Sequence, residues 1–173
     1  MTQTSSASSS AEGVRLRTQV TPRDEAEVRR LAEATGFFRA DETDIACELV
    51  RDRLAQGPAS GYEFVVAESE DGRMLGYASF GEIPCTIGAY DLYWIIVDPA
   101  LQGRGLGKLL VREVESAVRA LRGRLVYIET SSMPLYAPTH AFYERCGYAL
   151  SARLADFYKP GDDKLIYAKS LGD

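Results

Sequence analysis

Three glycines and two basic residues crowd one short segment, VDPALQGRGLGKLL (residues 97–110), between an apolar run and an amphipathic stretch. Glycine leaves the backbone open to a ligand, and the start of a helix presents unpaired N–H groups with a partial positive charge. Because such a junction attracts anions, the segment predicts a site for phosphate or pyrophosphate. The residues concerned are Gly103, Arg104, Gly105, Gly107 and Lys108.

Two common phosphate loops do not fit this spacing. A P-loop would require glycine in place of Gln102 and serine or threonine in place of Leu109. The dinucleotide fingerprint would require glycine in place of Lys108, within the first strand–helix pair of the fold. What remains is Gln-x-x-Gly-x-Gly after an apolar run, with the alternative of a tight turn that binds nothing.

The composition does not favour covalent catalysis by an enzyme nucleophile. The chain has one histidine, His140, so neither a metal cluster nor a nucleophile–histidine pair is indicated. Its three cysteines, Cys47, Cys85 and Cys146, lack metal-type spacing and predict free thiols. Free thiols are typical of a reducing compartment, so we expect a cytoplasmic protein.

The hydrophobic patterns around the junction predict the order strand, two helices, three strands, helix, strand, helix, two strands. Thr21 is expected to cap the first helix, with Pro22 at its first position. A mixed α/β sheet with helices on both faces follows. Strands are expected at 14–20, 62–69, 74–83, 90–97, 124–130, 148–158 and 164–171, and helices at 21–38, 41–55, 106–121 and 138–147.

The bulk composition bounds the class of protein. A chain of 173 residues, 46% hydrophobic and 26% charged, makes one globular domain. Its net charge of −5 disfavours nucleic acid and anionic membrane as partners. No apolar run reaches the roughly 20 residues that span a bilayer. Residues 1–13 are Ser-rich and predict a disordered tail, which leaves residues 14–173 as the domain.

The unit around the junction resembles the acetyl-CoA-binding motif of the GNAT superfamily of N-acetyltransferases. In that family the strand is followed by Q/R-x-x-G-x-G/A, matched here by Gln102, Gly105 and Gly107. The likeness extends over residues 14–171, since YIETSS is similar to the family's fifth strand and AFYERCGY to its later helix motif. The resemblance implies a GNAT fold, with a mixed, mostly antiparallel sheet of about seven strands and about four helices on both faces.

The resemblance also implies a reaction, the direct transfer of acetyl from acetyl-CoA, without a metal, to the primary amine of a small molecule or peptide. The amine loses a proton, the carbonyl oxygen needs a hydrogen-bond donor, and the leaving thiolate gains a proton. An N–H of Ile96 or Val97 would serve the carbonyl oxygen. The implied cofactor-binding residues are Ile96, Val97, Gln102, Gly103, Arg104, Gly105, Leu106, Gly107, Lys108 and Tyr136.

Tyr143 stands at the position of the family tyrosine that protonates the thiolate, so the resemblance implies a general acid. The alternative is a core tyrosine that packs its helix beside Phe142. The chain departs from the family at Tyr136, where many relatives have an asparagine seven residues before the catalytic tyrosine. A hydroxyl and a ring would have to replace the contact that asparagine makes with CoA.

The general base has two candidates. Asp91 stands where some family members carry a catalytic glutamate, and is otherwise an exposed strand-end carboxylate. Glu129 is a weaker candidate, and is otherwise the partner of Arg124 or another basic group. On an ideal strand Asp91 shares a face with Ile95 and Val97, and a bulge would shift that alternation.

The acceptor amine is expected to contact residues 35–44 and 81–91. Aromatic residues there could form a wall, or be ordinary core and loop residues. Acidic residues of the first segment would attract a cationic amine, although acids are also common at a helix start. The aromatic candidates are Phe37, Phe38, Tyr90 and Tyr93, and the acidic ones are Asp41, Glu42 and Asp44.

Two other functions are open on the sequence alone. One is a module of the same fold that binds acyl-CoA as a sensor and catalyses nothing. The other is a toxin that acetylates aminoacyl-tRNA, against which the net charge of −5 argues. The acceptor and the acyl-chain length are not specified, and a homodimer, common in the superfamily, is compatible with the sequence.

Overall fold

The computed structural model describes residues 13–172, so the tail predicted for residues 1–13 lies outside the described range except for Gly13. Seven strands and four α-helices follow one another in the predicted order within this range. The strands are β1 (Val14–Arg17), β2 (Glu63–Ser69), β3 (Met74–Glu82), β4 (Ala89–Val97), β5 (Leu125–Ser131), β6 (Ala149–Lys159) and β7 (Asp162–Ser170). The helices are α1 (Asp24–Thr35), α2 (Ala40–Gln56), α3 (Leu106–Ala120) and α4 (Ala137–Arg145). Between residues 13 and 172, no helix combines the length and apolar character needed to cross a membrane.

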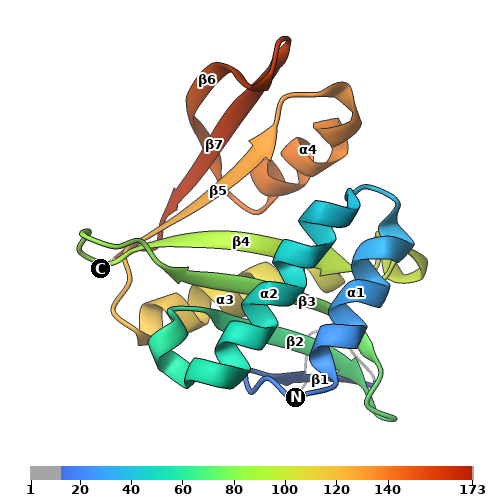
Figure 1. The fold of residues 1–173 in the computed structure, drawn as a ribbon. Helices are drawn as coiled ribbons and strands as arrows, with labels where there is room; N and C mark the ends of the chain where they lie inside the picture. The colour runs from blue at the N-terminus through green and yellow to red at the C-terminus, as the bar shows by residue number, and fades with distance from the viewer. Residues whose placement is uncertain (1–12, 173) are drawn as a thin grey trace, which may run out of the picture.

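All seven strands join one sheet in the order β1-β2-β3-β4-β5-β7-β6. Neighbours are antiparallel except β4 and β5, which run parallel and are linked through α3. The mixed, mostly antiparallel sheet expected from the resemblance is confirmed. β4 and β5 pair only over residues 89–92 and 125–128, and then diverge (Figure 1). Beyond this point no described residue pairs with the β5-facing edge of β4.

Helices cover both faces of the sheet, as predicted. α3 and α4 pack on one face, here called the α3–α4 side, and α1 and α2 pack over β2, β3 and β4 on the other, the α1–α2 side (Figure 1). Each fully buried Leu or Val contributes about 1.5–3 kcal/mol, so the apolar stripe of α3 fixes the helix and the junction that starts it. That stripe is Leu106, Leu110, Val111, Val114 and Val118.

β4 contains a bulge at Tyr93, which lies between the pairs Phe80–Leu92 and Ser79–Trp94. A bulge places one extra residue on its strand, so side chains before and after it alternate in opposite phase. The strand that borders the opening between β4 and β5 is therefore irregular where the opening begins.

The bulge changes which residues share a face of β4. Leu92 lies in the core beneath α3, whereas Ile96 lies in the core beneath α1 and α2. Asp91, next to Leu92, therefore faces the α1–α2 side, and Ile95 and Val97 pack on the α3–α4 side. The expectation for an ideal strand, that Asp91 shares a face with Ile95 and Val97, is wrong, and the alternative of a bulge holds.

The first helix begins at Asp24 rather than at Pro22. Thr21 does not cap it, because its hydroxyl has no hydrogen-bond partner among residues 13–172. Instead the Thr21 N–H donates to the carboxylate of Asp24 (2.8 Å). Asp24 is buried and pairs with Arg17 of β1 (2.7 Å), so an ion pair fixes the start of α1 against the sheet.

Candidate functional site

The side chain of Asp98 fixes the chain between β4 and α3. Its carboxylate accepts a hydrogen bond from the Ala100 N–H (3.1 Å) and pairs with Arg73 (2.8 Å) and Arg30 (3.4 Å). A 3-10 turn, Pro99–Leu101, follows. Because Asp98 is buried, these contacts hold the exit of β4 and direct the loop that comes next.

Residues Gln102 to Gly105, at the start of the loop, are exposed to solvent. Gly103 (φ +76°) and Gly105 (φ +87°) lie in the left-handed region, and a Cβ on either would meet no atom within 4 Å. The Leu109 N–H donates to the Gly105 carbonyl (3.0 Å), so the N–H groups at the start of α3 precede the first i to i−4 bond. The loop therefore gives an anion a set of backbone donors at a helix N-terminus.

Two basic side chains stand beside this backbone. Arg104 and Lys108 are exposed, and neither forms an ion pair with another residue between 13 and 172. Leu106, predicted with them as a cofactor contact, turns its side chain into the core and can contribute only its backbone. The two basic groups are free to pair with the negative charge that the loop would hold.

Gly107 differs from the other two glycines. A Cβ at this position would meet the ring of Phe142 at 3.3 Å and the side chain of Val97 at 3.8 Å. Its bare side faces α4 rather than a ligand, which corrects the interpretation that all three glycines clear the way to a phosphate. The missing side chain lets α4 approach the start of α3.

The open edge of β4 supplies backbone donors. The Asp98 N–H donates to the Leu75 carbonyl of β3 (2.9 Å), and alternate residues of an antiparallel strand face the same neighbour. The N–H of Ile96 therefore points to β3, whereas that of Val97 points to the edge from which β5 diverges. Of the two donors predicted for the carbonyl oxygen, the geometry favours Val97.

Tyr143 lies on α4 in the core of the α3–α4 side and is 5% exposed. Its ring centroid is 5.5 Å from that of Phe142, 6.0 Å from that of Tyr167 and 6.3 Å from that of Tyr148. Burial raises the pKa of Tyr143, which keeps the phenol protonated. The side chain thus packs its helix, as the alternative held, and its role as a general acid stays a prediction.

Asp91 and Glu129 face the α1–α2 side from β4 and β5. Burial raises the pKa of Asp91, the charge of Glu129 raises it further, and the charge of Lys164 lowers it. Glu129 pairs with Lys164 (2.5 Å) and not with Arg124, which donates to the Ile87 carbonyl (2.8 Å). Asp91 forms no ion pair among residues 13–172, so it is the freer of the two candidate bases.

Three of the four aromatic residues predicted near the acceptor lie on the α1–α2 side. The fourth, Tyr90, is buried in the core beneath α3, because it is adjacent to Asp91 and its side chain points to the opposite face of β4. For Tyr90 the alternative of an ordinary core residue holds. The other three are Phe37, Phe38 and Tyr93.

Tyr136 lies beside the segment that joins α1 to α2. Its ring centroid is 6.2 Å from that of Phe37, and burial and the charge of Glu42 raise its pKa. Its neighbours therefore belong to the α1–α2 side, and its part in cofactor binding stays a prediction.

Sequence patterns give no prediction for three further side chains at this site, which belong to β6 and β7. The Nζ of Lys164 is 3.8 Å from the centroid of the Phe157 ring and 6.0 Å from that of Tyr158. In the sequence these residues belong to an ordinary strand pair, and the only signal was an aromatic pair just before Lys-Pro-Gly.

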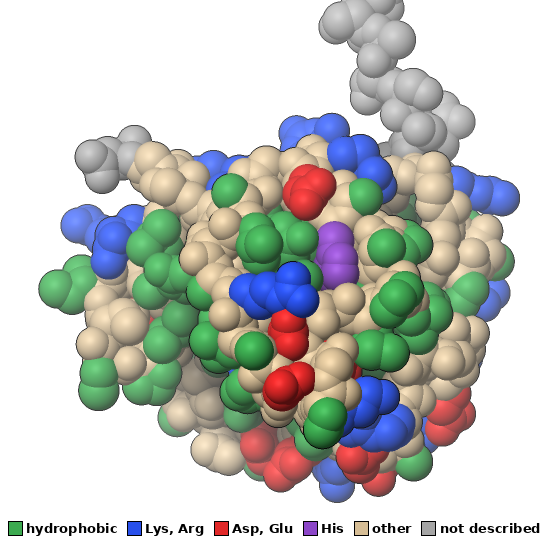
Figure 2. Space-filling view, turned by 90° about the horizontal axis from the view of Figure 1, so that it is seen from above, with side chains coloured by type: hydrophobic (Ala, Val, Ile, Leu, Met, Phe, Trp, Pro, Cys, Tyr) green, Lys and Arg blue, Asp and Glu red, His purple; other side chains and the backbone are tan. Residues whose placement is uncertain are grey.

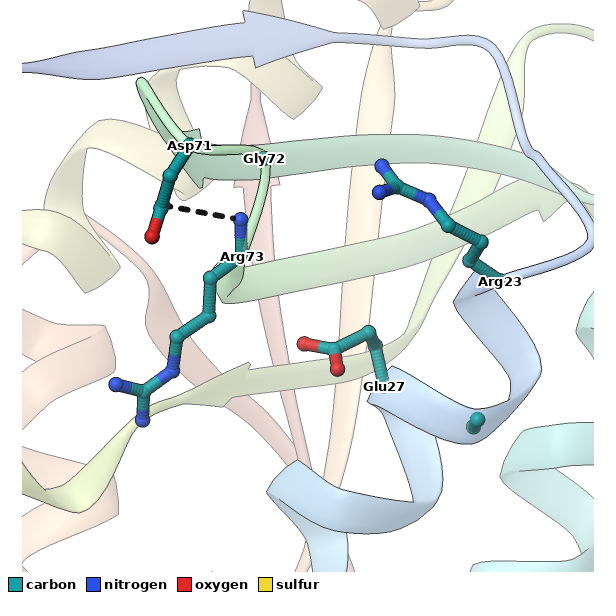
Figure 3. Close-up of a pocket in the computed structure, with 6 residues that line it drawn as sticks. Arg23, Glu27, Asp71, Gly72 and Arg73 are labelled. Atoms are coloured by element: carbon teal, nitrogen blue, oxygen red, sulfur yellow. Dashed lines mark hydrogen bonds between the residues drawn. The ribbon is translucent and has the colours of Figure 1, made fainter.

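A separate pocket lies between the start of α1 and the turn that joins β2 to β3 (Figure 3). Most of the side chains that line it are charged, and one of them, Arg73, forms an ion pair with Asp98. The pocket therefore belongs to the network that holds the exit of β4, and contains none of the predicted site residues. Arg23, Ala26, Glu27, Asp71, Gly72 and Arg73 line it.

Comparison with known families and sequences gives consistent findings. The family described as an acetyltransferase (GNAT) domain matches residues 60–150. The N-alpha-acetyltransferase RimI of Mycobacterium tuberculosis is 38% identical over 117 residues, which cover 66% of this chain and 71% of that protein. The mycothiol acetyltransferase of Rhodococcus erythropolis is 29% identical over 150 residues, which cover 79% of this chain and 47% of that protein. The chain spans about half the length of the mycothiol acetyltransferases that it matches.

Solved structures extend the likeness to the whole described fold. A protein of the GNAT family from Desulfovibrio desulfuricans is 50% identical and has a TM-score of 0.90, with 92% of this chain and 99% of that chain covered. An aminoglycoside 6'-N-acetyltransferase in complex with coenzyme A has a TM-score of 0.73 at 17% identity, over 92% of this chain and 97% of that one. The second likeness concerns the fold alone.

Proposed function

This chain belongs to the GNAT acetyltransferase family, and from that premise we propose that it transfers the acetyl group of acetyl-CoA to a primary amine of a small molecule or peptide. The observation that carries the proposal is the bare, basic loop at the start of α3, next to the unpaired edge of β4. The relatives named as acetyltransferases support the reaction class. Because the mycothiol acetyltransferases are about twice as long, their acceptor is not transferred to this chain.

The residues of this chain fit acetyl-CoA. The N–H groups from Gly103 to Lys108, together with the Arg104 guanidinium, would hold the pyrophosphate. The edge of β4 after Leu92 has free backbone groups for the amides of pantetheine, since β5 no longer pairs with it. Loop and edge follow one another in the chain, as the two ends of an extended cofactor would require.

Acetyl-CoA supplies a thioester whose carbonyl carbon is attacked by the amine. Asp91 would remove the proton of the amine from the α1–α2 side, and the Val97 N–H would stabilise the charge on the carbonyl oxygen. Tyr143 would give its proton to the thiolate from the α3–α4 side. The base and the acid thus stand on opposite faces of the sheet, where β4 and β5 diverge.

The first test measures the binding of acetyl-CoA by calorimetry. Gly105→Glu should weaken binding by a factor of about 100 or more, because a side chain and a negative charge replace the space for a phosphate. Gly36→Glu is the matched control, since Gly36 also has a positive φ (+66°) and open space around it. Equal affinity of wild type and Gly105→Glu would contradict the assignment of the loop.

The second test measures release of CoA thiol across a panel of amino acids, polyamines, aminoglycosides and short peptides. Release that depends on one acceptor and falls in Tyr143→Phe supports an N-acetyltransferase. Tight binding of acetyl-CoA with no release from any acceptor supports the sensor module instead.

We also propose a cytoplasmic location and a homodimer. The cytoplasmic location is supported by the three cysteines, which form no disulfide between residues 13 and 172. The homodimer is supported by β6, an edge strand that exposes Leu150 and Leu154. Sedimentation equilibrium would measure the mass of the particle in solution and test the dimer directly.

A further inference from the structure

We propose that the acceptor is a monoamine carried on an aromatic or similarly flat apolar body, bound on the α1–α2 side where β4 and β5 diverge. This inference rests on the proposed function, since it concerns the second substrate of the same site.

Aromatic side chains from five elements and connections gather on this side. They form edge-to-face pairs, with centroid distances of 6.2 Å for Phe37–Tyr136 and 5.7 Å for Tyr62–Tyr93. Lys164 links the rings of β6 to the neighbouring strand, because its ammonium lies 3.8 Å from the centre of the Phe157 ring and pairs with Glu129 on β5. The full set is Phe37, Phe38, Tyr62, Tyr93, Trp94, Tyr136, Phe157 and Tyr158.

Several of these rings are exposed although they are large and apolar. The exposed fraction is 51% for Phe157, 47% for Tyr158, 40% for Phe37 and 38% for Tyr93. The view from above in Figure 2 shows hydrophobic side chains on both sides of a central strip of charged residues. Exposed rings that pack edge-to-face against one another leave their free faces for a ligand of the same kind.

The rings of Phe157 and Tyr158 are held in place by a wide bulge of β6, residues 155–158. This bulge lies between the β6–β7 pairs formed by Leu154 and Lys159. The Asp156 N–H donates to the Asp163 carboxylate (2.8 Å), and Asp156 in turn accepts from the Gly161 N–H (2.7 Å). The bulge is thus a built wall of the site rather than a loose loop.

The charges beside the rings are largely paired within the protein. Glu129 faces Lys164 (2.5 Å), and Glu42 faces Arg39 (3.5 Å). Asp162 is buried and accepts a hydrogen bond from the Ser131 hydroxyl (2.6 Å). Neither Asp162 nor Asp91 has an ionic partner in the described part of the chain, but only Asp91, which is half-buried, also accepts no hydrogen bond there. One free carboxylate complements one ammonium group.

Lys164 excludes a second cation. Its ammonium lies 3.8 Å from the centre of the Phe157 ring and pairs with Glu129, which is the environment that aromatic rings and a carboxylate would offer to a cationic ligand. The protein has therefore filled that position with its own cation. A diamine or an aminoglycoside would place a second positive charge against Lys164, whereas a flat apolar body would not.

The test compares three amines of different shape and charge with the full-length protein. We expect kcat/KM for 2-phenylethylamine to exceed that for 1,6-diaminohexane and for kanamycin by about tenfold or more, from ring contacts and repulsion by Lys164. Higher kcat/KM for either polycation would overturn the inference and leave the proposed function standing. Failure of acetyl-CoA itself to bind would overturn both.

A binding measurement gives a readout besides turnover. Trp94 is the only tryptophan and packs edge-to-face with Phe38 (5.2 Å), so its fluorescence should change when 2-phenylethylamine binds to the CoA-saturated protein. Phe157→Ala should weaken this binding about tenfold, while Leu121→Ala, which removes an exposed side chain at the end of α3, should leave it unchanged. Unaltered binding by Phe157→Ala would overturn the inference.

A variant that gains activity toward a diamine gives the most direct test. Lys164→Met removes the internal cation and frees Glu129, so the ratio of kcat/KM for 1,6-diaminohexane to that for 2-phenylethylamine should rise about tenfold. Lys164→Arg keeps the charge and should keep the wild-type ratio. An unchanged ratio in Lys164→Met would show that this lysine does not exclude cations.

Discussion

Tyr143 is surrounded by the rings of Phe142, Tyr148 and Tyr167, so a phenylalanine at this position fills the same space. Tyr143→Phe should bind acetyl-CoA with unchanged affinity, while kcat falls by a factor of about 100, the usual range for loss of a positioned acid. Single-turnover kinetics beside calorimetry would separate the two. A variant with the turnover of the wild type would remove Tyr143 from the reaction.

The proposed role of Asp91 as the general base predicts how activity depends on pH. Burial and Glu129 raise its pKa, and Lys164 opposes them, while Tyr93 is the other titratable neighbour. A base works when deprotonated, so the acidic limb of kcat/KM should lie above the ordinary pKa of an aspartate. Glu129→Gln removes a negative neighbour and should move that limb to lower pH. Lys164→Met removes a positive one and should move it to higher pH.

The measurement is kcat/KM against pH with one acceptor, so that the pKa of the amine is common to all profiles. Asp91→Asn should lose most of its activity together with the acidic limb. If the acidic limb keeps its position in both Glu129→Gln and Lys164→Met, a group other than Asp91 is the base.

At the scale of elements, an ion-pair network ties β1, β2 and α1 together. Glu68 is buried on β2 and pairs with Arg15 and Arg17, and Arg17 continues to Asp24 (2.7 Å) at the start of α1. Hydrogen bonding to Arg17 is the main cause that lowers the pKa of Glu68. Its stabilising contribution is therefore present above the pKa of the unfolded chain and is lost as pH falls through the folded pKa.

Glu68→Gln should lower the free energy of unfolding by about 2 kcal/mol at neutral pH, because Arg17 keeps Asp24 but loses the second of its two carboxylate partners. Urea titrations at pH 7 and at acidic pH would measure this. The difference between wild type and variant should shrink toward acid. An equal difference at both pH values would contradict the role of the Glu68 charge.

Most elements could be predicted from the sequence, and the failures have local causes. The stripe of α3 and the alternation of the strands come from periodic burial, which a sequence displays directly. The bulge at Tyr93 has no such signal, because it depends on how β3 and β4 register with each other. That single shift separates Asp91 from the face of Ile95 and Val97.

The candidate site shows the same division. The loop of Gln102 to Lys108 could be located because a linear motif marks it. Phe157, Tyr158 and Lys164 reach the site only through the pairing of β6 with β7 and of β7 with β5. The sequence pattern assigned Gly107 to the ligand, because its contact with Phe142 joins two helices that are far apart in the chain and no sequence pattern displays it.

At the scale of the whole molecule, Lys169 joins three elements. Its ammonium on β7 donates to both oxygens of Glu115 on α3 (2.8 and 2.9 Å) and to the Cys146 carbonyl at the end of α4 (2.8 Å). Because β4 and β5 pair over only a few residues, this lysine helps to hold the second half of the sheet to the first.

Lys169→Met leaves buried Glu115 with only Arg119, at 4.0 Å, as a cationic neighbour and should cost about 3 kcal/mol of stability. The double variant Glu115→Leu/Lys169→Met removes both charges and should recover much of that loss. Thermal unfolding of Glu115→Leu, Lys169→Met and the double variant beside the wild type measures the coupling. A double variant as unstable as the sum of the single ones would show that the two side chains act independently.

The contact between Gly107 and Phe142 has a consequence for how this molecule can diversify. Since the Phe142 ring of α4 packs directly against Gly107 of α3, the donor loop and the helix of Tyr143 form one block, and neither can be replaced alone. The rings proposed to meet the acceptor come instead from the α1–α2 connection and the β6 bulge, outside that block. Exchange of those two segments between relatives is therefore a route to new acceptors that preserves the chemistry of the donor.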